Sequence, residues 1–179
     1  PADEVLQLRA RRYPAPMGKI SEFSLKDQIF LTGYRWRPID PVPWTSLDKP
    51  LSKCRLALVS TAGMVLPGQQ PFDKSAKGGD YSMRMVPRDA AVSDLADTHR
   101  SRSFDHSGLQ RDANLAFPLD RARELVASGR IGSLANEHVS LMGSITAPAR
   151  FVRDTAPEAA SRLGDDGVDR RGQQEIIDP

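Results

Sequence analysis

The most constraining feature of this sequence is a short apolar run, Leu56 to Val59, that is followed directly by four small residues. A near-continuous apolar run of this length is typical of a strand covered on both faces in a parallel sheet. Ser60, Thr61, Ala62 and Gly63 then bring hydroxyls and backbone amides to the carboxyl end of that strand, where open α/β sheets bind ligands. The run therefore predicts an α/β fold with a ligand loop after its central strand.

The composition limits the size of the fold around this strand. A chain of 179 residues is long enough for one domain with a core, and 14 prolines with 6% aromatic residues indicate a small core and long irregular parts. The +2 charge arises from 25 basic and 23 acidic residues, which does not imply nucleic acid. No apolar run approaches the roughly 20 residues of a membrane span, and no signal pattern opens the chain, so we expect a cytoplasmic protein with no membrane contact.

Hydrophobic periodicity predicts the remaining elements. Residues 81–86 alternate as a strand and residues 136–142 form a second buried strand. Helices are predicted from Pro118 to Ser128, from 151 to 163 and, after an Asp89 cap, to about Thr98. Together these elements predict a Rossmann-like, mostly parallel sheet over residues 51–169.

A proline- and aromatic-rich arm, residues 1–50, precedes this domain, and a polar tail, residues 170–179, follows it. A short helix is predicted before Pro14, and residues 17–50 are predicted to be extended. Arg35, Trp36 and Arg37 make the arm locally basic, a pattern that can touch phosphates. We favour an arm that packs on the domain, on a partner protein subunit or on another copy in a homo-oligomer.

The polar stretch from His99 to Asn114 is a second candidate site. His99, Asp105, His106 and Asp112 are residue types that bind metals, but their spacing matches no metal motif, so we expect solvated loop residues and no metal. We interpret His138, in the predicted 136–142 strand, as a core histidine.

Several separated motifs share their order and spacing with a known family. They include Pro43-Trp44-Thr45, the strand and loop of residues 55–63, Gly79-Asp80-Tyr81, Thr98-His99, the block of residues 112–126, and Met142-Gly143. With these motifs, residues 44–169 resemble the selenoprotein B family of glycine, sarcosine, betaine and D-proline reductases, and most nearly its D-proline reductase branch.

The resemblance implies reductive cleavage of a carbon–nitrogen bond in a small amino acid or betaine substrate, without a separate cofactor. In the family, a selenocysteine or cysteine attacks the carbon beside the carboxylate, since a selenolate or low-pKa thiolate is an ionised, soft nucleophile. The amides and hydroxyls of residues 60–63 would hold the substrate carboxylate, and His99, Asp112 and Asn114 would line the rim.

The family's reactive residue lies in a loop after the strand that follows an Asp-Gly-Val-Asp-like segment. That segment is present here as residues 166–169, but the expected strand and the cysteine or selenocysteine do not follow it. Cys54 does not replace them, because it lies at the entering end of the central strand, where we expect a buried, unreactive thiol.

Three explanations remain open: a truncated or frame-altered member, a non-catalytic structural or interaction subunit, and an enzyme whose nucleophile comes from another chain. A nucleotide- or phosphate-binding protein is a weaker reading, because neither glycine-rich phosphate motif is present.

Overall fold

The computed structural model describes residues 20–33, 47–101 and 106–169. The chain divides into two compact units, Pro1–Pro43 and Trp44–Pro179. The short helix predicted before Pro14, the Arg35–Arg37 cluster, Asp105 and the whole of the predicted tail lie outside the described residues.

The described part of the first unit is helical. A 3-10 turn, η1 (Ile20–Glu22), precedes helix α2 (Leu25–Gly33). Ser24 caps this helix, because its hydroxyl accepts the Asp27 amide at 3.3 Å and donates to the Asp27 carboxylate at 2.6 Å. The prediction of an extended backbone is therefore wrong over α2, where a side-chain cap allows a helical turn to begin.

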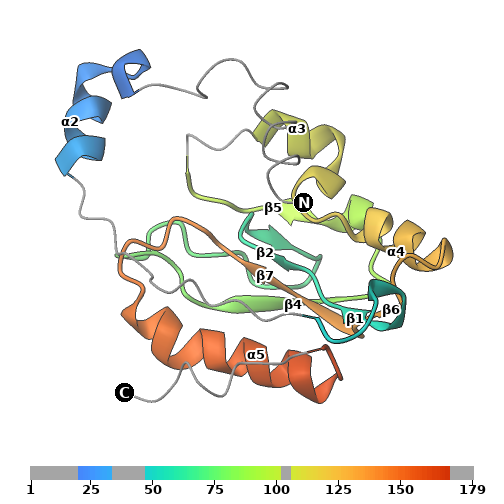
Figure 1. Ribbon diagram of the computed structural model, residues 1–179. Helices are drawn as coiled ribbons and strands as arrows, with labels where there is room; N and C mark the ends of the chain where they lie inside the picture. Colours follow the sequence, from blue (N-terminus) through green and yellow to red (C-terminus); the bar gives the residue numbers. More distant parts are fainter. Residues whose placement is uncertain (1–19, 34–46, 102–105, 170–179) are drawn as a thin grey trace, which may run out of the picture. The chain divides into compact units, whose positions relative to one another are not determined.

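The second unit is built around the buried strand β7 (Glu137–Leu141) (Figure 1). Strand β2 (Val59–Ser60) pairs with β7 in parallel, with Val59 opposite Val139. Strand β4 (Met83–Pro87) pairs with the other side of β7 in antiparallel orientation over five residue pairs. The strands predicted at 81–86 and 136–142 are thus confirmed.

Two smaller pairings complete the described sheets. Strand β1 (Arg55–Leu56) pairs in parallel with β6 (Ser133–Leu134). Strand β3 (Met64–Val65) pairs antiparallel with β5 (Ala96–Asp97). The architecture is therefore mixed α/β with small sheets, some of them parallel, whereas a Rossmann-like order stays a prediction.

The predicted central strand is interrupted between β1 and β2. The Leu56 carbonyl accepts the Ala135 amide and the Leu58 carbonyl accepts the Val139 amide, so the neighbouring chain carries two more residues between these bonds. The Leu58 amide donates to His138 Nδ1 at 3.2 Å instead of to a backbone carbonyl. A bulge of this kind ends regular pairing and bends the strand.

The prediction that the central strand is covered on both faces is wrong at its last residue. Strand β2 is at the edge of the described three-stranded sheet, and Val59 is 57% exposed. Apolar sequence alone does not distinguish an inner strand from an edge strand, because the same residues suit both positions.

Helices lie on both sides of the three-stranded sheet (Figure 1). Helix α4 (Leu119–Ala127) follows Pro118 and ends before Gly129, as predicted. Helix α5 (Ala156–Asp165) lies on the opposite side, and a π-helical turn, η5 (Phe151–Thr155), leads into it. Pro157 lies in the first turn of α5, directly after this π-helical turn.

The helix predicted after Asp89 is wrong. A 3-10 turn, η3 (Val92–Asp94), leads directly into β5. Val92 and Leu95 are both buried in the core, and β5 must pair with β3, so the chain is extended before a helix can continue. Short 3-10 turns η2 (Leu51–Lys53) and η4 (Ala113–Leu115) also occur.

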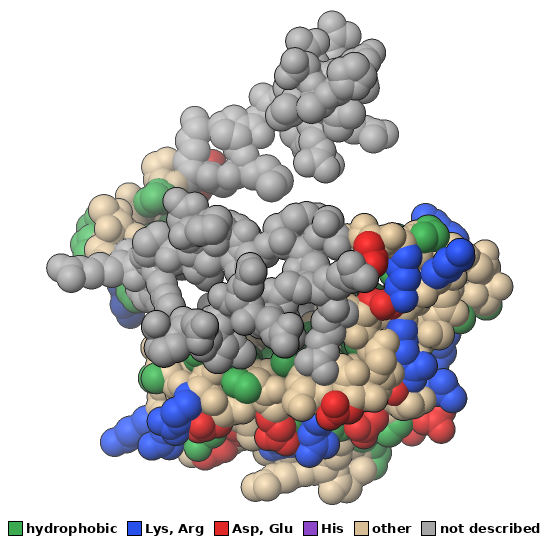
Figure 2. Space-filling model, turned by 60° about the horizontal axis from the view of Figure 1, so that its bottom comes forward, with side chains coloured by type: hydrophobic (Ala, Val, Ile, Leu, Met, Phe, Trp, Pro, Cys, Tyr) green, Lys and Arg blue, Asp and Glu red, His purple; other side chains and the backbone are tan. Residues whose placement is uncertain are grey.

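The core of the second unit lies between the sheets and helix α4. Its fully buried side chains include Met64, Val86, Phe117 and Leu119. Cys54 is buried just before β1, as predicted. On the face shown in Figure 2, acidic and basic side chains are interspersed along the lower margin.

Candidate functional site

The loop predicted to bind a ligand is tied into the fold by its own polar groups. The Ser60 hydroxyl donates to the Ala116 carbonyl at 2.7 Å and accepts the Ala62 amide at 3.2 Å. The Gly63 amide donates to the Leu141 carbonyl at 2.8 Å. Ala62 and Gly63 are buried, and Thr61 is exposed. The amides of Ala62 and Gly63 therefore already have acceptors within the chain.

The structure brings His99 against this loop. Gly63 has a φ of +68°, and a Cβ at that position would lie 3.0 Å from the His99 backbone nitrogen. A Cβ on Gly143 would lie 3.2 Å from His99 Nε2, so only small residues let the imidazole approach this closely. The Ser101 amide donates to His99 Nδ1 at 3.2 Å, which leaves the ring proton on Nε2. Burial lowers the pKa of His99 and favours this neutral form.

Asp97 connects His99 to a second histidine. One carboxylate oxygen accepts the His99 amide at 2.8 Å, and the other accepts Nδ1–H of His106. The Nε2 atom of His106 lies 3.0 Å from the Ser101 carbonyl oxygen, so both ring nitrogens face acceptors. The hydrogen bond to Asp97 raises the pKa of His106 and favours the imidazolium form.

A cleft of about 440 Å³ lies beside these residues, between the β3–β5 pair and helix α3 (His106–Arg111). Its apolar lining includes Met64, Leu95 and Leu109. Asp97, Gln110 and Arg111 supply its main polar groups. Polar and apolar residues thus line the cleft in similar measure, and a concave site that combines the two is able to hold a small molecule.

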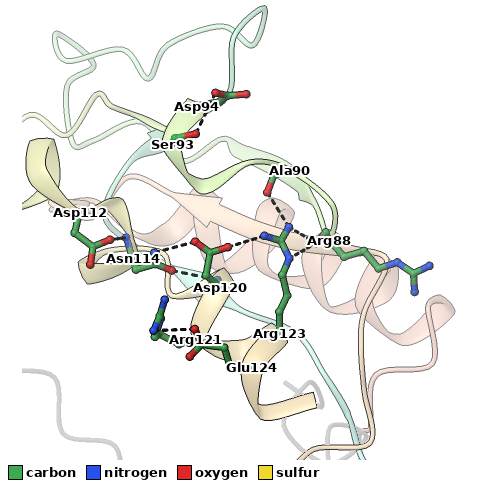
Figure 3. A network of polar contacts seen from close by, with 10 residues as sticks. All are labelled: Arg88, Ala90, Ser93, Asp94, Asp112, Asn114, Asp120, Arg121, Arg123 and Glu124. Atoms are coloured by element: carbon green, nitrogen blue, oxygen red, sulfur yellow. Dashed lines mark hydrogen bonds and ion pairs between the residues drawn. The ribbon is translucent and has the colours of Figure 1, made fainter. Parts of the chain in front are cut away.

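Asp112 and Asn114, which were predicted to line the site, belong to a capping network (Figure 3). Asp112 caps η4 by accepting the Asn114 amide at 2.9 Å. The Asn114 amide group donates to Asp120 at 3.0 Å and accepts the Asp120 backbone amide at 3.1 Å. These two residues thus begin η4 and α4, while their neighbour Ala113 lines the cleft.

Arg123 closes the same network. Its guanidinium contacts Asp120 at 2.7 Å, the Arg88 carbonyl at 3.0 Å and the Ala90 carbonyl at 2.7 Å (Figure 3). The hydrogen bond from Asn114 and the charge of Arg123 lower the pKa of Asp120. Each charged group in this network has a partner inside the chain, which is the arrangement of a structural contact.

His138 is a core histidine, as predicted, with no exposed surface. Its Nδ1 accepts the Leu58 amide, and among the described residues its Nε2 has no hydrogen-bond partner. Burial lowers the pKa of His138 to about 4. Within the described ranges, no group of three or more histidine, cysteine, aspartate or glutamate side chains is arranged to hold a metal ion.

The Asp166–Asp169 segment is attached to strand β1. The Arg55 amide donates to the Asp169 carboxylate at 2.7 Å, and the Asp169 amide donates to the Arg55 carbonyl at 3.4 Å. The Arg55 guanidinium also contacts the Asp166 carboxylate at 2.7 Å. Lys49 pairs with Asp169 at 2.5 Å. The chain therefore reaches Asp169 beside the strand that leads to the 60–63 loop.

Sequence reasoning missed Asp97 and Arg111 as members of the site. Both lie close to predicted residues in the sequence: Asp97 is two positions before His99, and Arg111 directly precedes Asp112. The acid–x–His spacing of Asp97 and His99 is a short-range signal, because the Asp97 carboxylate reaches the amide two residues later. Arg111 lines the cleft only because of the way in which α3 packs, and no local sequence pattern predicts that packing.

The family of the chain follows from comparison with known proteins. The family model described as glycine/sarcosine/betaine reductase selenoprotein B matches residues 22–171. The chain belongs to this family. No solved structure matches it.

Curated relatives are subunits of reductase complexes. The chain is 35% identical over 133 residues to the D-proline reductase subunit gamma of Acetoanaerobium sticklandii, covering 74% of this chain and 53% of that protein. It is 32% identical over 148 residues to the glycine reductase complex component B subunit gamma of Carboxydothermus hydrogenoformans, covering 81% of this chain and 33% of that protein. It is 28% identical over 144 residues to the sarcosine reductase complex component B subunit beta of Peptoclostridium acidaminophilum, covering 80% and 33%.

The chain thus spans about half the length of the first relative and a third of the other two. Within the described residues, no helix is long and apolar enough to cross a membrane.

Proposed function

We propose that this chain is a subunit of a reductase complex that reductively cleaves the carbon–nitrogen bond of a small amino acid or betaine. The observation that carries the proposal is the family match over residues 22–171, supported by 35% identity to a D-proline reductase subunit. Relatives in glycine and sarcosine reductase complexes support the same substrate class. Because these relatives are named as subunits of complexes, we expect this chain to have protein partners. A location in the cytoplasm stays a prediction.

The chemistry requires an ionised selenolate or thiolate that attacks the carbon beside the carboxylate and displaces the amine. A dithiol donor supplies the two electrons that release the reduced acid from the nucleophile. Cys54 is buried before β1 and does not line the cleft, so the nucleophile in this proposal comes from another chain or from a region not in this sequence. In the family, the reactive residue follows an Asp-Gly-Val-Asp-like segment. Here the end of that segment, Asp169, is bonded to β1, and this attachment supports the same placement of the segment.

The substrate pocket is proposed at the 60–63 loop, His99 and the neighbouring cleft, on a sheet that we still expect to be Rossmann-like in the whole protein. Since the Ala62 and Gly63 amides are bonded within the chain, these residues would shape the wall, and groups lining the cleft would meet the substrate. Asp112 and Asn114 would position α4 beside the pocket.

The experiment is reconstitution under anaerobic, reducing conditions with a cysteine- or selenocysteine-bearing partner subunit and a dithiol donor. Glycine, sarcosine, D-proline and betaine are offered separately, and release of the amine, or of the ring-opened product for D-proline, is measured by mass spectrometry. We expect turnover of one substrate. Absence of turnover with every partner and substrate would reject the catalytic role.

The second candidate is a non-catalytic interaction subunit. The apolar side chains of the first unit favour it: Phe23, Leu25, Ile29 and Phe30 are each 52–73% exposed. Exposed apolar side chains clustered on a short helix are typical of a contact surface for another protein. Deleting residues 20–33 should then abolish assembly while the second unit stays folded, and intact assembly would reject this candidate.

A further inference from the structure

We propose that the cleft between the β3–β5 pair and helix α3 binds a small zwitterionic amino acid, with Asp97 facing its ammonium group and Arg111 facing its carboxylate. The substrate class rests on the proposed function. The position and orientation of the ligand rest on the residues that line the cleft.

Arg111 is the reason to expect a carboxylate. It is exposed at the end of α3 and lines the cleft. Within the ranges that the structure describes, its side chain forms no ion pair or hydrogen bond with another residue. A guanidinium presents a planar pair of donors that matches a carboxylate in a bidentate contact. An arginine without a partner at a cleft is therefore available for this contact.

Asp97 is the reason to expect an ammonium group. Its side chain is only 14% exposed, and its position is held by the His99 amide and by His106. Each carboxylate oxygen has two lone pairs and uses one of them in these bonds, so each retains one for an N–H donor. Asp97 and Arg111 do not pair with each other. The Asp97 carboxylate is already paired with His106, so it offers an ammonium group only its two remaining lone pairs, whereas the charge of Arg111 has no counter-charge among the described residues.

The apolar lining fits the rest of such a ligand. Met64, Leu95 and Leu109 form the apolar part of the lining, against which the methylene groups of a small amino acid would lie. The volume of about 440 Å³ is within the range of small-molecule sites. A ligand with a single charge would contact only one of these two polar groups and would lose the hydrogen bonds that the other offers.

Binding is measured on the chain alone by calorimetry and by saturation-transfer NMR, with no partner and no turnover. Glycine, sarcosine and D-proline are compared with acetate and methylammonium, which carry one charge each. We expect the zwitterions to bind at least tenfold more tightly than either single-charge probe. Glycine betaine should bind more weakly than sarcosine, because its quaternary ammonium has no N–H to donate to Asp97.

Arg111→Met should reduce zwitterion affinity at least tenfold, and Arg121→Met is the matched control because Arg121 pairs with Glu124 on the exposed face of α4. Asp97→Asn should reduce affinity as much, with Asp89→Asn as its control and circular dichroism as the check on folding. Arg111 forms no contact on which folding depends, so its variant keeps the test valid if Asp97→Asn unfolds.

Equal affinity for acetate and glycine, or an unchanged affinity in Arg111→Met, would overturn the proposal. Absence of zwitterion binding to the folded chain would also overturn it. The outcome is separate from the proposed function: turnover in the reconstituted complex with a wild-type KM in Arg111→Met would reject this site and leave the reductase role standing.

Discussion

Two neighbouring regions of the second unit use the same residue types in different ways. Around Asp120, the carboxylate, the Asn114 amide and the Arg123 guanidinium are bonded to one another and to two backbone carbonyls (Figure 3). Around Asp97, the carboxylate is held by two histidine groups, but Arg111 on the same cleft has no partner among the described residues.

The difference distinguishes a structural network from a candidate binding site. A buried or half-buried polar group whose partners are all internal stabilises the fold and offers nothing to a ligand. A charged group at a cleft without an internal partner contributes little to stability and is available for binding. Both regions contain residues of the segment from His99 to Asn114, which is one continuous polar stretch in the sequence.

The largest expected effect concerns His138, whose pKa is lowered mainly by burial and also by the positive charge of Arg123 in the Asp120 network. Its pKa is about 4 in the folded chain and about 6.5 in the unfolded chain, so its contribution is complete above pH 6.5 and is lost as the pH falls toward 4. The shift corresponds to about 3 kcal/mol of unfolding free energy. Denaturant titrations of wild type and His138→Gln at several pH values measure it. Identical pH slopes for the two proteins would contradict the prediction.

Arg123→Ala should destabilise the second unit by about 2–3 kcal/mol, because it removes charged hydrogen bonds and leaves two carbonyls and Asp120 without their donor. Thermal and urea unfolding measure this change. The matched control is Arg121→Ala, whose exposed ion pair with Glu124 is expected to contribute less than 1 kcal/mol. Equal losses of stability in the two variants would show that the Asp120 network contributes no more than an exposed ion pair.

Gly63→Ala should cost about 1–2 kcal/mol, because an alanine is strained at a φ of +68°. Its Cβ would also lie 3.0 Å from the His99 backbone nitrogen, so the backbone at His99 must shift by a few tenths of an ångström. Gly68→Ala is a useful control, since Gly68 has a similar φ of +83° but open space around its Cβ position. The difference between the two unfolding free energies isolates the contact with His99, and no difference would show that the contact is unimportant.

His106 should show the opposite pH dependence from His138, and a smaller one. Its folded pKa is raised by Asp97, so its stabilising contribution is complete below about pH 6.5 and is lost as the pH rises through the folded value. NMR titration of the imidazole gives the folded pKa directly, and unfolding of His106→Gln gives the linked stability. A folded pKa below that of a model histidine would contradict the contact with Asp97.

The smallest expected effect is that of Arg111→Met on stability. Since the side chain is exposed and has no internal partner, we expect a change within about 0.5 kcal/mol in urea unfolding. A loss comparable to that of Arg123→Ala would show that Arg111 is a structural residue and would remove the contrast between the two regions.

Local patterns in the sequence predicted the elements that local physics controls. The amphipathic spacing after Pro118, the apolar run of residues 136–142 and the helical pattern of residues 151–163 each correspond to an observed helix or strand. The internal role of His138 was also predictable, because a histidine within an apolar strand is usually buried. The motifs spread along the chain predicted the reductase family from the sequence alone.

Tertiary packing decided the rest. The break between β1 and β2, the exposure of Val59 and the conversion of the predicted helix after Asp89 into β5 all depend on which distant segment pairs with each strand. The division of the polar stretch between a capping network and a cleft has the same origin: Asp112 and Asn114 contact the start of α4, while Arg111 lines the cleft beside Asp97. Residue type and spacing determine what a side chain is able to do, and only the packing of distant segments decides whether its partner is another residue or a ligand.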